Sequence, residues 1–300
     1  MKNLLVGLFN MGLVLLAAPL LDGVLRQVRA RLHSRQGPPL LQPWYDLAKL
    51  MVKDDQAGAN NFIFAAAPVI CLGAVLLASL FIPMGGIVPL GFAGDALVLI
   101  YILTLAPICM CLGGMASGSP FAYVGSNREI MMLMVVEPVL AITLIASAIK
   151  GHSLLLANSI HYYVAHLPAL SLIVCGIAFF MAVQLEVAKL PFDLAEAEQE
   201  IMEGPLVEYS GRKLALFQWS LYGKLIVFLT LFVETFLPWP KLGNLPVDIL
   251  ITLVKVLVAA VLVEIVAQVF PRLKIAQTMR YFAGVVGFAL AGLVLAVMGL

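Results

Sequence analysis

The sequence predicts an all-α integral membrane protein with about eight transmembrane helices. Of its 300 residues, 62% are hydrophobic and only 12% are charged, and the mean hydropathy is +1.04. A soluble domain carries about 25% charged residues, so lipid is the expected solvent of most of this chain. Because lipid offers no partner to an unpaired backbone group, each spanning segment is expected to be a helix.

Eight apolar stretches have the length of a membrane span, which takes about 20 mostly apolar residues. They lie at about 4–25, 62–84, 94–115, 128–149, 168–187, 214–236, 246–269 and 278–299. The first is longer than the roughly 7–15 apolar residues of a signal peptide and ends in arginines, so we interpret it as a span. The whole chain, 1–300, is expected to form a single transmembrane domain.

The basic residues predict which side of the membrane each loop occupies. Of the 18 Lys and Arg residues, 13 lie in or beside the loops after the first, third, fifth and seventh stretches, and three lie on the other side. Cytoplasmic loops carry such an excess, so these loops are placed in the cytoplasm and both termini outside. Amphipathic cytoplasmic loops are expected at 26–61, a docking loop, and at 187–213, an acidic loop.

Composition also limits the kinds of site that the chain is expected to hold. A net charge of +1 gives no indication of nucleic-acid binding. The four cysteines all fall inside apolar runs, where they are expected to be packing residues, so no metal site is predicted.

The docking loop is expected to contain an amphipathic helix. Gly37-Pro38-Pro39 breaks any helix that continues from the first span. After Pro43, apolar residues recur at helical spacing with charged residues among them: Trp44, Leu47, Leu50 and Met51 against Asp46, Lys49 and Lys53. This pattern predicts a helix that lies at the membrane surface or under a partner.

Several ionisable residues fall inside or at the ends of predicted spans. Each costs about 2.5–3.5 kcal/mol near the centre of a bilayer. They are Glu137, Glu186, Lys224, Glu234, Lys255 and Glu264. A single one could be a structural pair between helices, but a set distributed over four spans indicates a proton relay.

The acidic loop extends this set of charges. Its segment "KLPFDLAEAEQEIMEGPLVEYSG", residues 189–211, carries six carboxylates: Asp193, Glu196, Glu198, Glu200, Glu203 and Glu208. The spacing predicts a short helix from Pro191 to Gly204-Pro205, with Asp193, Glu196, Glu200 and Glu203 on one face. Two interpretations follow from the residues, a solvated acidic face or a funnel that takes up and releases protons.

These residues also carry a family resemblance. "LPFDLAEAEQE" and "VEYSG" resemble the signature of the membrane subunit that docks the peripheral arm in respiratory complex I. "RQGPPLLQPWYDLAKLMVKDD" is similar to the first cytoplasmic loop of that subunit, and "NREIMMLMVVEPVL" keeps its spacing of nine from Arg128 to Glu137. Departures such as Gly37-Pro38-Pro39 and Glu203-Gly204-Pro205 resemble the homologous subunit of membrane-bound, energy-converting [NiFe] hydrogenases, including the formate hydrogenlyase and carbon-monoxide-linked types.

The resemblance implies a non-catalytic anchor and ion-translocating subunit in a prokaryotic cytoplasmic (inner) membrane. It implies partners that are hydrogenase large and small subunits, an iron–sulfur subunit and antiporter-like membrane subunits, with the NiFe centre and iron–sulfur clusters in those partners and no cofactor in this chain. Electrons would come from ferredoxin or formate. The proton relay would comprise the ionisable residues of the spans and of the acidic loop, namely Glu137, Glu186, Asp193, Glu196, Glu198, Glu200, Glu203, Glu208, Lys224, Glu234, Lys255 and Glu264.

Partner docking would use the loops 26–61, 116–127 and 187–213. The residues assigned to it are Arg26, Arg29, Arg31, Arg35, Gly37, Pro38, Asp46, Lys49 and Arg128. The arginines would pair with an acidic partner surface or with anionic lipid head groups.

Two other functions stay open at this stage. The chain could be the quinone-site membrane subunit of an NADH:quinone oxidoreductase of the complex I type. It could also be a stand-alone ion-coupled transporter, although we see neither the repeat symmetry nor the interrupted helices that such transporters use.

Overall fold

The computed structural model describes residues 2–56, 58–84, 88–92, 95–165 and 169–299, and the protein is built from helices in these ranges. The helices are α1 (Lys2–Leu32), α2 (Gln42–Val52), α3 (Phe62–Phe81), α4 (Asp95–Ala116), α5 (Pro120–Lys150), α6 (Leu156–Ala165), α7 (Leu170–Glu186), α8 (Glu198–Ile201), α9 (Gly211–Phe236), α10 (Leu245–Val269) and α11 (Ile275–Val297), with a 3-10 helix, η1 (Gly204–Leu206), before α9.

Seven of the eight expected spans are confirmed as helices long and apolar enough to cross a membrane, namely α1, α3, α4, α5, α9, α10 and α11. The eighth, expected at 168–187, is the shorter apolar helix α7. Its 17 residues measure about 25 Å, less than the roughly 30 Å hydrocarbon core. It ends where Ala188 adopts a left-handed φ of 50°.

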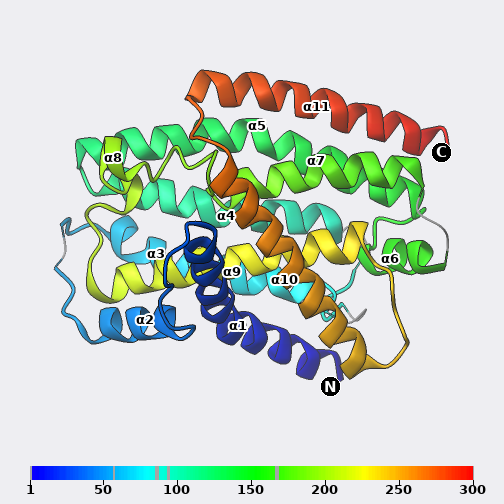
Figure 1. Cartoon of the computed structure of the whole chain (residues 1–300), viewed down its shortest axis with the longest axis horizontal. Helices are drawn as coiled ribbons and strands as arrows, with labels where there is room; N and C mark the ends of the chain where they lie inside the picture. The colour runs from blue at the N-terminus through cyan, green and yellow to red at the C-terminus, as the bar shows by residue number, and fades with distance from the viewer. Residues whose placement is uncertain (1, 57, 85–87, 93–94, 166–168, 300) are drawn as a thin grey trace.

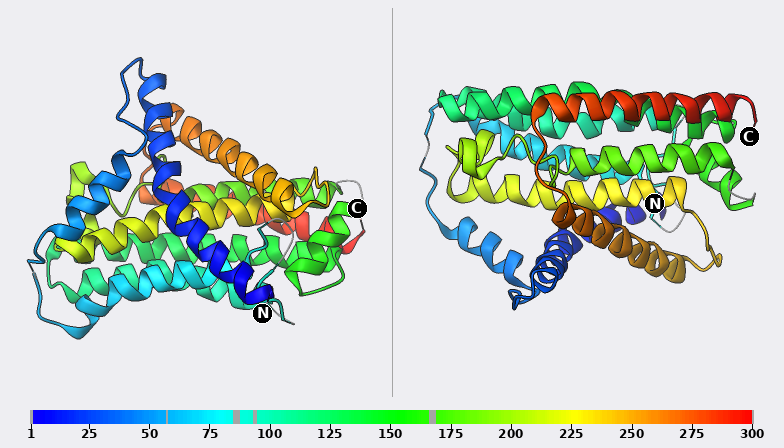
Figure 2. Two further views of the ribbon diagram at one scale, coloured as in Figure 1. Left: turned by 90° about the horizontal axis from the view of Figure 1, so that it is seen from below. Right: turned by 45° about the horizontal axis from the view of Figure 1, so that its top comes forward.

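The helices form a bundle crossed by an oblique pair (Figures 1 and 2). Helices α3, α4, α5, α7, α9 and α11 run side by side, and α1 and α10 cross one face of this bundle. Both termini lie towards the end of the molecule away from α2 and α8 (Figure 1), in keeping with the expectation that they share one side of the membrane. Which side that is stays a prediction.

Helix α9 is the centre of the bundle. All its residues from Gly223 to Phe236 are buried. Aromatic side chains fill the space around its last turns, where Phe232 stacks on Phe179 with 6.2 Å between ring centroids. Any charge on this part of α9 is therefore held away from solvent.

Of the two expected docking connections considered next, one differs from the sequence-based expectation and the other agrees with it. The expected docking loop at 116–127 is mostly helix, because α5 begins at Pro120, a residue suited to a first helical position. The amphipathic helix of the 26–61 loop is confirmed as α2, which buries Pro43 and Leu47 and leaves Tyr45 exposed. Trp44 of α2 packs edge-on against Trp219 of α9.

The single acidic helix expected after Pro191 was a wrong prediction. The only α-helix between α7 and α9 in the described residues is the four-residue α8. The segment turns into the bundle and buries Phe192, Leu194, Ala195 and Ala197. Residues one or two positions apart do not share a face of a helix, so burying all four favours an irregular backbone over an amphipathic helix.

Close backbone contact holds this segment against α5. A Cβ atom on Gly125 would lie 2.7 Å from Gly204 Cα and 3.0 Å from the Ala195 carbonyl oxygen. Gly204 itself has a φ of 52°, which favours glycine. The acidic loop can therefore approach α5 only because both positions lack a side chain.

We expect Gly125→Ala to lower the stability of the fold by about 1–3 kcal/mol, because the added methyl group meets backbone atoms that cannot move independently. The thermal unfolding midpoint of the detergent-purified protein measures the effect. Gly73→Ala on α3 is the matched control, since nothing lies within 4 Å of its Cβ position and alanine favours helix by about 1 kcal/mol. An unchanged midpoint in Gly125→Ala would contradict the close approach.

Candidate functional site

A buried ion pair lies at the centre of the molecule. Lys224, in the middle of α9, places Nζ 2.9 Å from Oε2 of Glu186, the last residue of α7. The side chains are only 7% and 1% exposed. The other carboxylate oxygen, Glu186 Oε1, has no hydrogen-bond partner among the described residues. Both residues were singled out in the sequence, and the structure brings them together.

Two further carboxylates share a small cavity with this pair. The central cavity has a volume of about 10 Å³, enough for about one water molecule. Its polar lining is Glu129, Glu186, Glu196, Lys224, Cys71 and Ser220. Three carboxylates therefore surround one ammonium group in a space from which bulk water is excluded.

Sequence reasoning missed Glu129, which is 7% exposed on α5. It follows Arg128 directly, and adjacent helical residues do not face each other. Arg128 points elsewhere and donates to Glu200 at 2.7 Å. The signal that could have found Glu129 was its place inside the predicted span 128–149.

Glu196 lies on the irregular segment between α7 and α8, outside the spanning helices. The residue is partly buried, but its Oε1 atom is fully buried and has no hydrogen-bond partner among the described residues. Burial, followed by the carboxylates of Asp193 and Glu129, raises the pKa of Glu196 to about 8. Glu196 can therefore gain or lose a proton near neutral pH.

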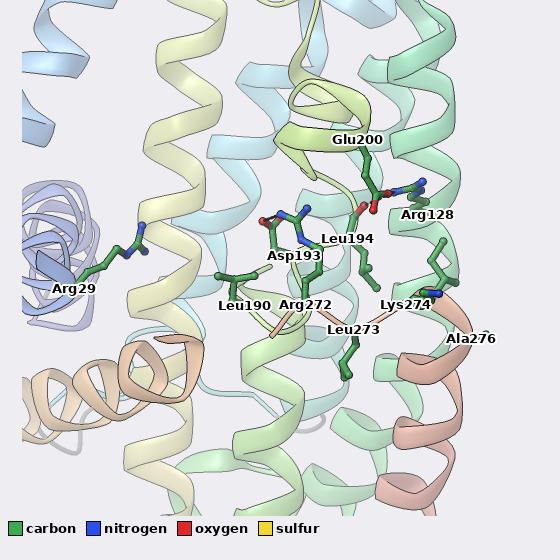
Figure 3. A pocket seen from close by; sticks show the side chains of 11 residues that line it. Arg29, Arg128, Leu190, Asp193, Leu194, Glu200, Arg272, Leu273, Lys274 and Ala276 are labelled. Carbon is green, nitrogen blue, oxygen red and sulfur yellow. Dashed lines mark hydrogen bonds and ion pairs between the residues drawn. The ribbon is translucent and has the colours of Figure 1, made fainter. Parts of the chain in front are cut away.

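A narrow cleft adjoins this cavity, and a wide cleft adjoins the narrow one. The wide cleft, about 920 Å³, is lined by Arg29, Arg128, Leu190, Asp193, Glu200, Arg272 and the start of α11 (Figure 3). The narrow cleft, about 430 Å³, shares Arg29, Leu190 and Asp193 with it. The narrow cleft shares Ala188, Glu196 and Leu221 with the central cavity. Glu196 thus lies between the clefts and the buried ion pair.

Ion pairs position the acidic loop at the wide cleft (Figure 3). Arg272 contacts Asp193 at 2.7 Å, and Arg128 contacts Glu200 at 2.7 Å. The hydrogen bond from Arg128 lowers the pKa of the exposed Glu200 carboxyl. Two of the expected relay carboxylates are therefore held as partners of arginine at the mouth of the cleft.

Arg26 and Arg29 were expected to contact partners, and each has an ion pair within the chain. Arg26 of α1 donates to Asp22 at 2.8 Å, to Asp46 of α2 at 2.9 Å and to the Tyr222 hydroxyl at 3.0 Å. Asp22 is a buried acid that the sequence analysis did not name. These contacts tie α1 to α2 and α9.

Glu264 lies away from the central cavity. It is fully buried on α10, and its Oε1 atom accepts from Arg29 at 2.6 Å. Lys189 places Nζ 3.9 Å from Glu264 and 4.0 Å from Asp22. Glu264 therefore belongs to the ion pairs that join α1, α10 and the acidic loop.

Glu234 and Lys255 form a separate polar cluster at the other end of α9. Glu234 is 2% exposed, lies 3.0 Å from Lys241 Nζ and accepts from the Thr252 hydroxyl at 2.6 Å. Lys255 donates to the Leu237 carbonyl at 2.9 Å. Ten residues, about 15 Å along the helix, separate Glu234 from Lys224, so the structure does not bring these two groups together.

The remaining residues of the sequence-based lists lie at or near the surface. Glu137 is half-buried on α5, Glu208 is partly buried, and Glu203 is exposed at the narrow cleft. The side chain of Glu198 lies outside the described part of the chain. The other partner-docking candidates are exposed or partly exposed. Arg31 lies in the last turn of α1, Arg35, Gly37 and Pro38 lie in the turn that follows, and Lys49 lies on α2. Within the described residues, no group of three or more His, Cys, Asp or Glu side chains could hold a metal ion.

Comparison with known proteins relates this arrangement to a family. A family model described as NADH dehydrogenase matches residues 5–297. Formate hydrogenlyase subunit 4 of Escherichia coli (strain K12) is 36% identical over 92% of this chain and 94% of its own length. Hydrogenase-4 component C of the same organism is 37% identical over 87% of this chain and 85% of its own length.

More distant relatives share the same architecture. An NADH-quinone oxidoreductase subunit of Geobacter sulfurreducens is 32% identical over 67% of each chain. A chain in the solved structure of the membrane-bound sulfane sulfur reductase, an archaeal respiratory membrane complex, is 26% identical with a TM-score of 0.91, covering 99% of this chain and 100% of that one. This chain therefore belongs to the NADH dehydrogenase family and is a multi-pass membrane subunit of a respiratory-type complex.

Proposed function

We propose that the chain is the membrane anchor and ion-translocating subunit of an energy-converting [NiFe] hydrogenase. In that complex it would couple electron transfer, from ferredoxin or formate to protons, with ion pumping. The observation that carries this proposal is the central cavity, where Glu129, Glu186, Glu196 and Lys224 line one space that adjoins the narrow cleft. The sequence identity also supports this reaction class, because it is 36% and 37% to the two hydrogenase subunits and 32% to the NADH-quinone oxidoreductase subunit.

The soluble subunits would dock on the basic side of the molecule. The exposed candidates for this contact are Arg31, Arg35 and Lys49, since Arg26 and Arg29 are already paired. The hydrogenase large and small subunits and an iron–sulfur subunit would carry the NiFe centre and clusters, and antiporter-like subunits would extend the membrane part. This chain would hold no cofactor and both termini would lie outside.

The clefts and the cavity would carry the proton inward. A proton from the wide cleft would reach Glu196 by way of the narrow cleft. From Glu196 it would pass to the carboxylates of Glu129 and Glu186, and Lys224 would stabilise whichever carboxylate is ionised. Because these groups titrate together, a charge change in the docked subunits would shift their protonation as a set.

The other ionisable residues would act beyond the cavity. Glu137, half-buried on α5, would accept the proton after the cavity carboxylates and carry it further into the membrane. Glu264, Glu234 and Lys255 lie outside the cavity, so they would need water or a neighbouring subunit to join the path. Such carboxylates can bind either H⁺ or Na⁺, and the translocated ion would be one of these two.

A quinone-reducing role is the second candidate, because a quinone oxidoreductase subunit is 32% identical to this chain. The narrow cleft, at about 430 Å³, has the size of a small-molecule pocket, typically 300–1,000 Å³. Such pockets are mostly apolar, whereas this cleft is lined by Arg26, Arg29, Lys189, Asp193, Glu196 and Glu203. This charge favours proton chemistry over a quinone with an apolar tail. A stand-alone transporter does not fit a family whose members are subunits of complexes.

Gentle detergent extraction tests the reaction class. We expect the chain to copurify with a nickel-containing subunit and iron–sulfur proteins, and the complex to evolve hydrogen. Elemental analysis and hydrogen measurement check this. Copurification without nickel, together with reduction of added quinone, would establish the second candidate instead.

The relay is tested in the intact complex with Glu186→Gln and Glu137→Gln. Glutamine keeps the side-chain shape but cannot exchange a proton, so we expect hydrogen evolution to continue while the ion gradient per hydrogen falls at least about tenfold. A pH-sensitive dye in vesicles measures the gradient. Asp55→Asn is the control, because Asp55 pairs with Lys213 away from both clefts. A full gradient in both glutamine variants would end the relay hypothesis.

Glu196 is expected to titrate near pH 8. Its pKa in the folded protein, about 8, lies above its ordinary value of about 4.3. Between these values the folded chain holds a proton that the unfolded chain lacks, so the contribution of Glu196 to stability decreases as pH rises through this interval.

Difference infrared spectroscopy measures this titration. We expect a protonated-carboxyl band that disappears with a midpoint near pH 8 and is absent in Glu196→Gln. Glu200→Gln is the matched control, since Arg128 keeps that exposed carboxyl ionised. A midpoint at the ordinary glutamate value would show that Glu196 is not enclosed.

A further inference from the structure

We propose that Lys189 is a mobile counter-cation of Glu196. Its ammonium group lies between Asp22 and Glu264 while Glu196 is protonated, and it moves along the narrow cleft to Glu196 when that carboxyl loses its proton. The part that this movement plays in proton transfer rests on the proposed function. The movement itself does not, since it can be observed in a complex that pumps no ion.

Lys189, near the start of the acidic loop, is a loosely held cation. Its side chain is 21% exposed, and Nζ lies 4.0 Å from Asp22 and 3.9 Å from Glu264, the nearest carboxylates among the described residues. Both distances exceed the range of about 2.7–3.2 Å for a hydrogen bond from nitrogen to oxygen. The ammonium group is therefore attracted to two carboxylates without being fixed to either.

These two carboxylates already have closer partners. Asp22 accepts from Arg26 at 2.8 Å, and Glu264 accepts from Arg29 at 2.6 Å. If the Lys189 ammonium group moved away, each carboxylate would keep its arginine. The movement therefore leaves no buried charge without a partner, which would cost several kcal/mol.

The narrow cleft gives the ammonium group room to reach Glu196. Lys189 and Glu196 both line this cleft, which has a volume of about 430 Å³. A lysine side chain has a flexible four-carbon stem, so its charge can change position while the backbone stays in place. The charge of Lys189 already acts on Glu196, because it is among those that oppose the rise in the pKa of that carboxyl.

The other cations near Glu196 are held more closely. Arg26 and Arg29, which line the same cleft, are paired with carboxylates at 2.6–2.9 Å, and Lys224 is paired at 2.9 Å. The other titratable groups that line the narrow cleft or the central cavity carry no positive charge, and they are Cys71, Glu129, Glu186, Asp193, Glu203 and Tyr222. Among the described residues that line these two spaces, Lys189 is therefore the cation most able to follow a new charge on Glu196.

The movement would link the protonation of Glu196 to the ion pairs of α1 and α10. While Glu196 holds a proton, the positive charge stays beside Asp22 and Glu264. When the proton leaves, the ionised carboxylate gains a counter-ion in a place where an unpaired charge is costly. Lys189 would thus ease the release of the proton and help to set the pH at which it occurs.

Structures of the intact complex at two pH values test the movement. Cryo-electron microscopy at about pH 6.5 and about pH 9.5 covers both sides of the Glu196 titration and stays below the ordinary lysine pKa of about 10.4. We expect Lys189 Nζ to lie beyond hydrogen-bonding distance of Glu196 at the lower pH and within about 3.2 Å of its carboxylate at the higher pH. In Glu196→Gln, the matched control, Lys189 should keep the low-pH position throughout. One position at both pH values, or the same shift in Glu196→Gln, would overturn the proposal.

Infrared titration of Glu196 tests the charge. Lys189→Met removes the cation and should raise the midpoint by about one pH unit or more, the effect of an opposite charge at close range. This equals about a tenfold change in proton affinity. Lys189→Arg keeps the charge and should keep the midpoint close to its original value. Lys213→Met is the matched control, since Lys213 is 20% exposed and pairs with Asp55 away from both clefts. An unchanged midpoint in Lys189→Met would exclude a counter-cation at this position.

These measurements separate the counter-cation from the proposed function. Both report on Lys189 and Glu196 whether or not the complex pumps ions. If Glu196→Gln built a full ion gradient while the movement and the midpoint shift were present, the relay would lose Glu196 and the counter-cation would be supported.

Discussion

The buried ion pair between Lys224 and Glu186 is the constraint on which the rest of the site depends. A lysine in the middle of a fully buried helical segment is stable only with a partner at hydrogen-bonding distance, because an unpaired charge there costs several kcal/mol. Glu186 supplies that partner at 2.9 Å. The end of α7 is therefore fixed against the middle of α9, and this sets where the acidic loop begins.

The irregular path of the acidic loop follows from this starting point. Since the loop leaves α7 beside a buried pair, its first residues stay inside the bundle and bury Phe192 and Leu194. The same path brings Glu196 to the cavity and leaves Asp193 and Glu200 at the cleft, where arginines hold them. One short segment therefore supplies both a carboxyl that can exchange protons and carboxylates that are fixed as structural partners.

The sequence predicted the spans well because their signal is local. Apolar length alone located seven of the eight, and the cost of intramembrane charge singled out Glu186 and Lys224. Local signals could not reveal which charges meet. Glu264 and Glu234 resemble Glu186 in the sequence. Yet the oblique crossing of α1 and α10 places Glu264 against Arg29, whereas Glu234 lies near the last turn of α9 and pairs with Lys241. The prediction of a helix in the acidic loop, made from helical spacing, was wrong because spacing alone does not show which residues the rest of the bundle buries.

The surroundings of Lys224 on the side away from the clefts bear on whether protons could pass through the chain without being coupled to electron transfer. Lys224 also lines a second small cavity, about 10 Å³, whose other lining side chains are apolar and include Val75, Leu103 and Val227. Apart from Lys224, this lining offers no polar side chain to a proton, so the cavity itself supplies no hydrogen-bonding step along α9 towards Glu234. In the proposed function, a charge that reached Lys224 would advance along α9 only if another part of the complex hydrated this layer or accepted the charge sideways. The proposed ion translocation would need this separation, because a continuous polar path across one chain would dissipate the gradient that electron transfer builds.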